Sequence, residues 1–240
     1  MNIWLSEIDR QRFGVNIAKL NVSQTGELGD IDAWCQAQHV AMLIIRCPSE
    51  RTDIVQQLER EGAQLMDTLV YYRKPGVVRV HANVPCGYEI RSATVNDATD
   101  LEQLAVRAFS GASGHYHADS RLAKADCDMV YGSWAANSCA SKDVADEVIL
   151  ATFGGAIAGF LTLKCRPDDT VEIVLNAVDP RHQGRGLYQA LVSLAQNWTA
   201  EQGRSNLIVS TQLTNLGPQK VWCRQSFEPF SSFYTLHKWF

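Results

Sequence analysis

The stretch VEIVLNAVDPRHQGRGLYQAL, residues 171–191, decides the fold of this chain. An apolar run typical of a buried strand comes first, and a helix with leucines along one face begins directly after the turn 181–186. The first backbone N–H groups of a helix have no intrahelical partner, and the helix dipole favours an anion beside them. The two glycines of the turn let a phosphate approach closely, and its two arginines add positive charge. The turn therefore predicts a pyrophosphate-binding site.

The apolar pattern on either side of this stretch predicts an α/β chain in two parts. Turn signals at Pro75-Gly76 and Pro85-Cys86-Gly87 separate the parts, so we expect a small N-terminal α/β domain over residues 1–85 and a larger domain over residues 86–240. The first part has predicted strands at residues 13–22, 40–46 and 63–72 and a helix at 53–61. The second has predicted strands at residues 88–93, 147–153, 158–165, 171–178, 207–211 and 233–239 and helices at 97–109, 122–136, 186–201 and 218–225.

An ordinary strand-to-helix turn with solvated arginines is the plainer interpretation of residues 181–186, because short glycine motifs also occur by chance. Here, however, the turn follows three consecutive strands that are preceded by two helices. It also lacks the first-strand position and the downstream acidic residue expected of a dinucleotide-binding Rossmann unit. This context favours the pyrophosphate site.

The order of elements and the R/Q-x-x-G-x-G/A form of the turn resemble the GNAT superfamily of acetyl-CoA-dependent N-acyltransferases, over about residues 88–240. The resemblance implies a mixed, twisted central sheet flanked by helices, with acetyl-CoA as co-substrate. It also implies that the strand before the turn pairs with the pantetheine arm, that the turn holds the pyrophosphate, and that Asn215 lies near the cofactor arm. The residues expected to bind the cofactor are Leu175, Asn176, Ala177, Val178, Arg181, Gln183, Gly184, Arg185, Gly186, Leu187, Tyr188 and Asn215.

A narrower resemblance at the two ends of the chain concerns the acceptor. Residues 13–16, FGVN, and residues 211–239, which begin TQLTN, are similar to bacterial acetyltransferases that act on nucleotide-linked amino sugars. This implies a small-molecule amine as partner, such as dTDP-4-amino-4,6-dideoxygalactose, and a smaller domain in front of the GNAT domain. That domain could pack against the acceptor site or form a homodimer, and the sequence leaves both open.

Transfer of an acetyl group to an amine requires a base, stabilisation of an oxyanion and a proton for the leaving thiolate. Glu172 resembles, in its spacing to the turn, the catalytic glutamate of the histone-acetylating branch, and we expect it to be the base. Burial among its apolar neighbours on the strand would raise the pKa of its carboxyl. Alternation along a strand makes a solvent-facing glutamate the equal alternative. Backbone N–H groups around Ala177 would polarise the thioester carbonyl.

The group that protonates the thiolate departs from the family pattern. A tyrosine usually stands seven residues after the asparagine matched by Asn215, and Trp222 takes that position here. An indole N–H is too weak an acid to protonate a thiolate, although it can donate a hydrogen bond to the sulfur. Water, Tyr188, Tyr234 or Cys223 could complete the transfer, and core packing is the alternative role for Trp222.

Residues 110–121 lie between the first two helices of the second part, where the GNAT fold builds part of its acceptor site. His115, Tyr116 and His117 are candidates to stack on a base or sugar, or to supply an alternative base near neutral pH. Arg121 is a candidate to meet a nucleotide diphosphate. A polar loop with incidental histidines is the alternative interpretation.

Composition limits the remaining possibilities. Hydrophobic residues make up 46% and the net charge is -4, so the chain can bury a core and has no general attraction to nucleic acid or an anionic membrane. The seven cysteines have neither CxxC spacing nor histidines at zinc-ligand intervals, so we expect free thiols and no metal site. Residues 1–10 do not form a signal-peptide pattern, and no apolar stretch approaches the roughly 20 residues that span a bilayer. We therefore expect a cytoplasmic protein.

Three functions stay open at this point. The first, which we expect, is N-acetylation of a nucleotide-linked amino sugar by direct transfer. The second keeps the GNAT chemistry but uses another small-molecule or protein amine. The third is a weakly catalytic module that binds acyl-CoA, and the tryptophan at position 222 is the feature that favours it.

Overall fold

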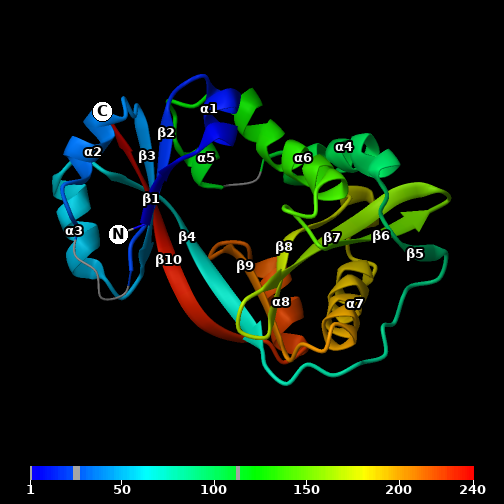
Figure 1. The fold of residues 1–240 in the computed structure, drawn as a ribbon. Coiled ribbons are helices and arrows are strands. Elements are labelled where there is room, and N and C mark those ends of the chain that lie inside the picture. The colour runs from blue at the N-terminus through cyan, green and yellow to red at the C-terminus, as the bar shows by residue number, and fades with distance from the viewer. Residues whose placement is uncertain (1, 24–27, 112–113) are drawn as a thin grey trace.

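The computed structural model describes residues 2–23, 28–111 and 114–240, so residues 112–113 of the predicted acceptor segment lie outside it. Within these residues, the strands form one sheet of ten in the order β1-β2-β3-β10-β4-β9-β8-β7-β6-β5 (Figure 1). The strands are β1 (Asn2–Leu5), β2 (Ile17–Asn21), β3 (Met42–Pro48), β4 (Gln64–Lys74), β5 (Tyr88–Ser92), β6 (Glu147–Phe153), β7 (Ala156–Arg166), β8 (Thr170–Val178), β9 (Asn206–Gln212) and β10 (Glu228–Trp239). The helices are α1 (Glu7–Phe13), α2 (Ile31–Ala37), α3 (Thr52–Arg60), α4 (Ala98–Phe109), α5 (His115–Ala118), α6 (Lys124–Ala140), α7 (Leu187–Glu201) and α8 (Leu216–Arg224).

The first part of the chain differs from its prediction at the N-terminus. The expected strand at residues 13–22 begins only at Ile17, because helix α1 continues to Phe13 and ends at Gly14, whose φ of 71° stops the helix. Strand β1 and helices α1 and α2 were not predicted, because these elements span only four to seven residues and offer too short a pattern. The predicted boundary at residue 85 falls within the connection from β4 to β5 and stays a prediction.

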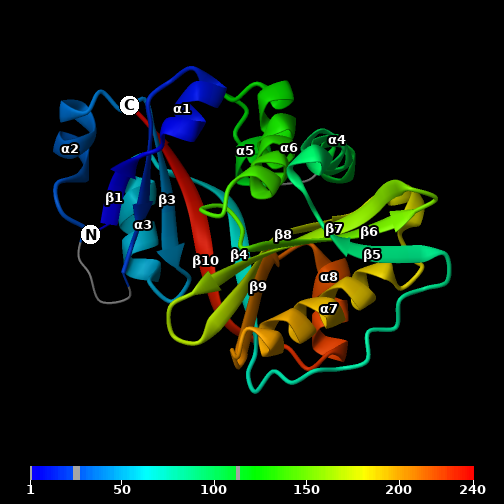
Figure 2. The ribbon, with the colours of Figure 1, turned by 45° about the vertical axis from the view of Figure 1, so that its right-hand side comes forward.

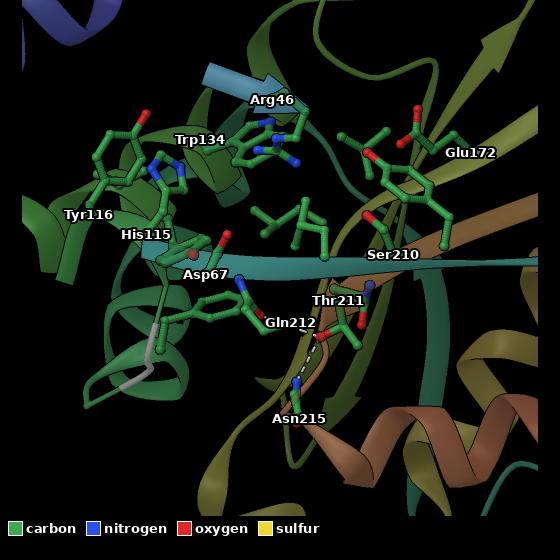
Figure 3. Close-up of a pocket in the computed structure, with 18 of the residues that line it drawn as sticks. Arg46, Asp67, His115, Tyr116, Trp134, Glu172, Ser210, Thr211, Gln212 and Asn215 are labelled. Carbon is green, nitrogen blue, oxygen red and sulfur yellow. Dashed lines mark hydrogen bonds between the residues drawn. The ribbon is translucent and has the colours of Figure 1, made fainter. Parts of the chain in front are cut away.

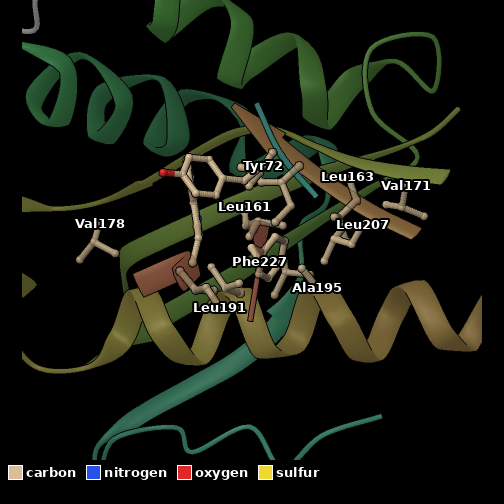
Figure 4. Packing of buried hydrophobic residues seen from close by; sticks show 14 of the residues in the cluster. Tyr72, Leu161, Leu163, Val171, Val178, Leu191, Ala195, Leu207 and Phe227 are labelled. Atoms are coloured by element: carbon tan, nitrogen blue, oxygen red, sulfur yellow. The ribbon is translucent and has the colours of Figure 1, made fainter. Parts of the chain in front are cut away.

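The second part follows the predicted order, with the short helix α5 as an addition inside the expected loop. Helix α7 covers one face of the sheet, where its Leu191 and Ala195 join Leu161 of β7 and Leu207 of β9 in a buried apolar cluster (Figure 4). Helices α4 and α6 bury the other face of β6, β7 and β8 through a second cluster. The mixed sheet is therefore flanked by helices on both faces.

The last strand joins the two parts of the chain. Strand β10 pairs antiparallel with both β3 and β4, and β4 pairs in turn with β9. Figure 2 shows β10 and β4 running side by side through the middle of the molecule, with α1, α5 and α6 on one side of them. Residues from the first and last segments of the chain are thus brought to one place.

Strands β8 and β9 are parallel neighbours that pair over only four residues each. Their register runs from Thr170 opposite Asn206 to Ile173 opposite Val209. Just beyond, β8 carries a bulge, where the Leu175 N–H donates to Thr162 Oγ1 of β7 at 2.9 Å. A bulge bends its strand, and β9 stays paired to β4 as far as Gln212. The two strands therefore separate and leave a gap between their C-terminal halves.

Candidate active site

A cavity of about 540 Å³ extends from this gap toward β4 and α5 (Figure 3). At the gap it is lined by Glu172, Val174, Leu175, Asn176, Ser210, Thr211, Asn215 and Trp222. At the other end it is lined by Asp9, Arg12, Lys19, Arg46, Asp67, His115, Tyr116 and Tyr131. One end is therefore mainly strand edge and the other end is rich in charged side chains.

The glycine turn lies where β8 passes into α7. Gly184 and Gly186 have φ values of 73° and 82°, and a Cβ built on either would meet no atom within 4 Å. Gly186 is the N-cap of α7, and no side chain caps the helix there. The first N–H groups of this 15-residue helix thus have no side-chain cap, and the space around the two glycines before them is open. These features fit a phosphate group, as the sequence predicts.

The two arginines of the turn have different environments. Arg181 makes a two-point ion pair with the buried carboxylate of Asp179, with nitrogen–oxygen distances of 2.9 and 2.7 Å. The hydrogen bonds from Arg181 and Arg107 outweigh burial and lower the pKa of Asp179 below its ordinary value. Arg185 is exposed. The charge of Arg181 therefore stabilises the turn itself, whereas that of Arg185 faces solvent.

The edge of β8 at the gap offers backbone groups of fixed direction. The Leu175 and Asp179 N–H groups both point toward β7, where they donate to Thr162 Oγ1 and to the Ala158 carbonyl. Because directions alternate along a strand, the N–H groups of Asn176 and Val178 point into the gap and that of Ala177 points toward β7. The Gln183 side chain donates to the Val178 carbonyl at 3.1 Å on this open side. An extended ligand chain could pair with this edge as a strand does.

Asn215, the N-cap residue of α8, and Trp222 of the helix itself line the cavity at the gap. Asn215 Nδ2 donates to Thr211 Oγ1 at 2.9 Å and lies at the cavity wall (Figure 3). Trp222 is 1% exposed, and its Nε1 donates to the Tyr188 hydroxyl at 2.9 Å. The one N–H of the indole is thus engaged by Tyr188, and burial raises the pKa of that tyrosine above its usual value. Leu187, the residue before it, is buried in the α7 cluster.

Glu172, on β8, lines the cavity, as a glutamate that acts in the site must. Its side chain is only 15% exposed, and Arg166 Nε donates to its Oε2 at 2.7 Å. An ion pair therefore holds one of its two carboxylate oxygens. The sequence interpretation did not anticipate this partner, which comes from the neighbouring strand β7.

The charged end of the cavity is organised around Asp9 of α1. This carboxylate is 1% exposed. It accepts hydrogen bonds from Ser6 and Tyr116 and forms ion pairs with Arg12 and Lys19. Burial would raise the pKa of Asp9, but these partners outweigh it and lower the pKa instead. Sequence reasoning missed this cluster, because α1 was not predicted.

Arg46 and Asp67 are the other two charged groups that sequence reasoning missed. Arg46, on β3, forms no ion pair with a described residue and lines the cavity. Both carboxylate oxygens of Asp67, on β4, are buried and receive no hydrogen bond from the described part of the chain. A carboxylate buried without a partner is costly, so this group requires a further partner such as water or a ligand. An aspartate within the apolar run of residues 63–72 was the signal available in the sequence.

The predicted acceptor residues divide into two pairs. His115 and Tyr116 line the cavity, and Tyr116 donates its hydroxyl proton to Asp9 at 3.0 Å. His117 instead pairs with Asp128 at 2.9 Å, and Arg121 pairs with Asp119 while stacking over Trp239. Neither His117 nor Arg121 lines the cavity.

A second hollow, of about 570 Å³, adjoins the charged end. It shares the walls formed by Lys19, Arg46, Tyr71, His115 and Tyr116 with the main cavity. Aromatic rings line its outer part, namely Trp4, Phe230 and Phe233. Tyr71 packs edge-on against both phenylalanines, with ring centroids 6.2 and 5.5 Å apart. The hollow thus joins a cationic inner wall to an aromatic outer one.

Comparison with known proteins identifies the family of this chain. The model of the acetyltransferase (GNAT) family matches residues 100–227, more than half of the chain. The chain belongs to the GNAT acetyltransferase family. As a GNAT protein it is an acyltransferase, and the splayed strands and glycine turn described above lie within or beside the matched segment.

Relatives of this GNAT chain match it almost from end to end. The dTDP-fucosamine acetyltransferase of Escherichia coli is 27% identical over 94% of this chain and 93% of its own length. The spore coat polysaccharide biosynthesis protein SpsD of Bacillus subtilis is 20% identical over 99% of this chain and 81% of its own length. A GCN5-related N-acetyltransferase from Sphaerobacter thermophilus superposes with a TM-score of 0.69 at 13% identity, over 99% of this chain and 76% of that one, which confirms the fold.

Three further features of this GNAT chain concern its surroundings and partners. All seven cysteines are free thiols. Among the described residues, no cluster of three or more histidine, cysteine or acidic side chains is placed to hold a metal ion. Across the same residues, no helix has the length and apolar character needed to cross a bilayer.

Proposed function

We propose that this protein transfers the acetyl group of acetyl-CoA to the amine of a nucleotide-linked amino sugar. The observation that carries the proposal is the continuity of one cavity, from the gap between β8 and β9 to the charged and aromatic end. A two-substrate transfer needs both substrates to meet in one enclosed space. The relative that acetylates dTDP-fucosamine, similar over 94% of the chain, supports this acceptor class.

Coenzyme A would lie along β8 and the glycine turn. In this proposal the N–H groups of Asn176 and Val178 pair with the pantetheine arm, and those at the start of α7 hold the diphosphate. Arg185 adds positive charge from the exposed side of the turn, and Asn215 stands at the end of the arm. Acetyl-CoA supplies the activated acetyl group, and these residues supply its position.

The acceptor would occupy the charged end and the adjoining hollow. Arg46 has no ion-pair partner among the described residues and faces both spaces, which suits a diphosphate that links sugar to nucleoside. The aromatic rings around Tyr71 and Phe230 suit a nucleobase. The unpartnered carboxylate of Asp67 suits the ammonium group of the sugar. A free amino sugar, which has neither diphosphate nor nucleobase, would contact only Asp67 among these residues.

The chemistry around the thioester has two candidates from the sequence. Glu172 is one candidate base, with Arg166 holding its Oε2. At the leaving group, Trp222 is engaged by Tyr188, so we propose that it positions the Tyr188 hydroxyl and that the proton of this hydroxyl is the one directed at the sulfur. This assigns a positioning role to the tryptophan that replaces the family's tyrosine.

Thiol release measured with acetyl-CoA and a panel of amines tests the proposal. The panel holds dTDP-4-amino-4,6-dideoxygalactose, the same amino sugar without its nucleotide, an aminoglycoside and a lysine-containing peptide. We expect the nucleotide-linked sugar to have the highest kcat/KM, and Arg46→Gln to reduce its advantage over the free sugar by tenfold or more. Preference for another amine would favour the second function above, and binding of coenzyme A without turnover of any amine would favour the acyl-CoA-binding module.

A further inference from the structure

A row of three side chains, of which Asp119 and His237 are buried and His115 is half-buried, leads from the interior of the protein to the charged end of the cavity. Asp119 Oδ2 lies 2.8 Å from His237 Nδ1, and His237 Nε2 lies 2.9 Å from His115 Nδ1. His237 is 0% exposed, whereas His115 lines the cavity (Figure 3). His115 is the first residue of α5, Asp119 directly follows this helix, and His237 is on β10. The helix and the sheet together fix the order of the three side chains.

The charge of Asp119 determines which nitrogen of each ring carries the proton. Hydrogen bonds from Arg121, Trp239 and His237 outweigh burial and hold the pKa of Asp119 below its ordinary value, so it accepts and does not donate. His237 must therefore carry its proton on Nδ1 and, as a neutral ring, present a lone pair at Nε2. His115 must then donate from Nδ1, which leaves its own lone pair on Nε2.

The free nitrogen of His115 is the one that matters for chemistry. No described residue hydrogen-bonds His115 Nε2, and the ring borders both the main cavity and the adjoining hollow. The preceding residue, Gly114, is close to the end of β9, since a Cβ there would lie 3.8 Å from Gln212 Nε2. A neutral imidazole with a fixed tautomer thus borders the space proposed for the acceptor, near the end of β9.

We propose that His115 is the general base of the acetyl transfer, with His237 and Asp119 as positioning residues. This inference rests on the proposed function. His115 Nε2 takes one proton from the acceptor ammonium, and the freed lone pair of the nitrogen attacks the thioester carbonyl. The new N–C bond forms and the C–S bond breaks, while the Tyr188 hydroxyl gives its proton to the departing sulfur and takes up the second proton of the amine in return. The proton on His115 then returns to solvent, and Asp119 stabilises the imidazolium through His237 while it exists.

The surroundings of His115 keep it neutral before the acceptor binds. Burial is the largest effect, and His237 from β10, Arg46 from β3, Lys19 from β2 and His117 from α5 add to it, so the pKa of His115 lies well below its ordinary value. Burial also lowers the pKa of His237, although the charges of Asp119 and of Asp67 on β4 raise it in part. The base is therefore unprotonated and ready at neutral pH.

Two measurements on the full chain test the inference. In the first, kcat and KM for dTDP-4-amino-4,6-dideoxygalactose are followed from pH 5 to 9. We expect His115→Gln to lower kcat by on the order of 10²- to 10⁴-fold at every pH in this range, since the base is neutral throughout it. Its affinity for coenzyme A, measured by calorimetry, should stay within about twofold. Glu172→Gln should lower kcat less than His115→Gln does, and His81→Gln, on the exposed connection before β5, is the control for loss of a histidine.

The second measurement reads the tautomers without turnover. In ¹⁵N NMR spectra at pH 7, we expect the rings of His115 and His237 to be neutral and protonated on Nδ1, and Asp119→Asn to change the proton position on His237. Turnover of the sugar with an unchanged kcat in His115→Gln, or protonation of His115 on Nε2, would overturn the inference and leave the proposed function standing. Absence of thiol release from the wild-type protein with every amine overturns both.

Discussion

Trp222 Nε1 of α8 donates a hydrogen bond to the Tyr188 hydroxyl in the first turn of α7 over 2.9 Å. This contact links the helix that begins at the glycine turn to the helix that closes the gap between β8 and β9. It also gives the buried indole N–H of Trp222 a hydrogen-bond partner, as a buried polar group requires.

The contact between Trp222 and Tyr188 predicts a measurable coupling. Trp222→Phe and Tyr188→Phe each leave a polar group without its partner and should cost about 1 to 3 kcal/mol of unfolding free energy. The double variant leaves no orphaned group, so its loss should be about 1 kcal/mol smaller than the sum of the single losses. Urea unfolding of the four proteins measures this difference, and strictly additive losses would show that the hydrogen bond contributes nothing.

Gly186 should matter for coenzyme A binding beyond its effect on the backbone. At a φ of 82°, Gly186→Ala strains the chain by roughly 1 to 2 kcal/mol and places a methyl group in the space assigned to the phosphate. Gly203→Ala is the matched control, because Gly203 has a φ of 67°, is equally open around its Cβ position and lies past the far end of α7.

Both alanine variants should lose similar unfolding free energy, but only Gly186→Ala should weaken coenzyme A binding, by tenfold or more in calorimetry. Equal affinity in the two variants would remove the turn from the binding site.

Asp67→Asn should change stability and activity in opposite directions. The carboxylate oxygens of Asp67 are buried without a hydrogen bond from any described residue, so loss of the charge should raise the unfolding free energy by roughly 1 kcal/mol. The same change should raise the KM for the amine at least tenfold, since the ammonium loses its counter-charge. A variant that is less stable with an unchanged KM would show that Asp67 has a structural partner instead.

Stability should fall in two stages as the pH is lowered. Burial lowers the pKa values of His115 and His237 in the folded state, so the unfolded chain binds protons first and stability declines below about pH 6.5. The lowered pKa values of Asp119 and Asp179 add a second loss, which begins near the ordinary carboxyl pKa of about 4 and continues as the pH approaches the folded values.

Urea unfolding at a series of pH values measures both stages. His237→Gln should flatten the first stage and leave the second in place, whereas an unchanged slope between pH 6.5 and 5 would contradict the assignment.

The sequence predicted the elements that form the proposed cofactor end more completely than those that form the proposed acceptor end. The glycine turn, the strand before it and the helix after it are contiguous, so their local pattern carries the structure, and strand β8 and helix α7 were found where expected. The proposed acceptor end combines Asp9, Lys19, Arg46 and Asp67 with His115, behind which His237 is buried. These residues are spread over most of the chain and are brought together by the insertion of β10 between β3 and β4. No spacing in a single sequence encodes that pairing.

Individual residues show the same limit. His115 was among the acceptor candidates, but its link to Asp119 through His237 crosses 118 positions in the sequence. Glu172 was chosen from its place on the strand, and its partner Arg166 could be found only from the register of β7 on β8. Local patterns indicate which residues are candidates, and the tertiary pairing decides what each of them contacts.

The central claim is that the glycine turn at the start of α7 binds the diphosphate of coenzyme A through backbone N–H groups. The most direct measurement is a calorimetric comparison of coenzyme A with pantetheine, which has the same thiol arm but no diphosphate. The account predicts that coenzyme A binds with an affinity at least a hundredfold higher than that of pantetheine. Equal affinities for the two compounds, or no binding of coenzyme A, would contradict it.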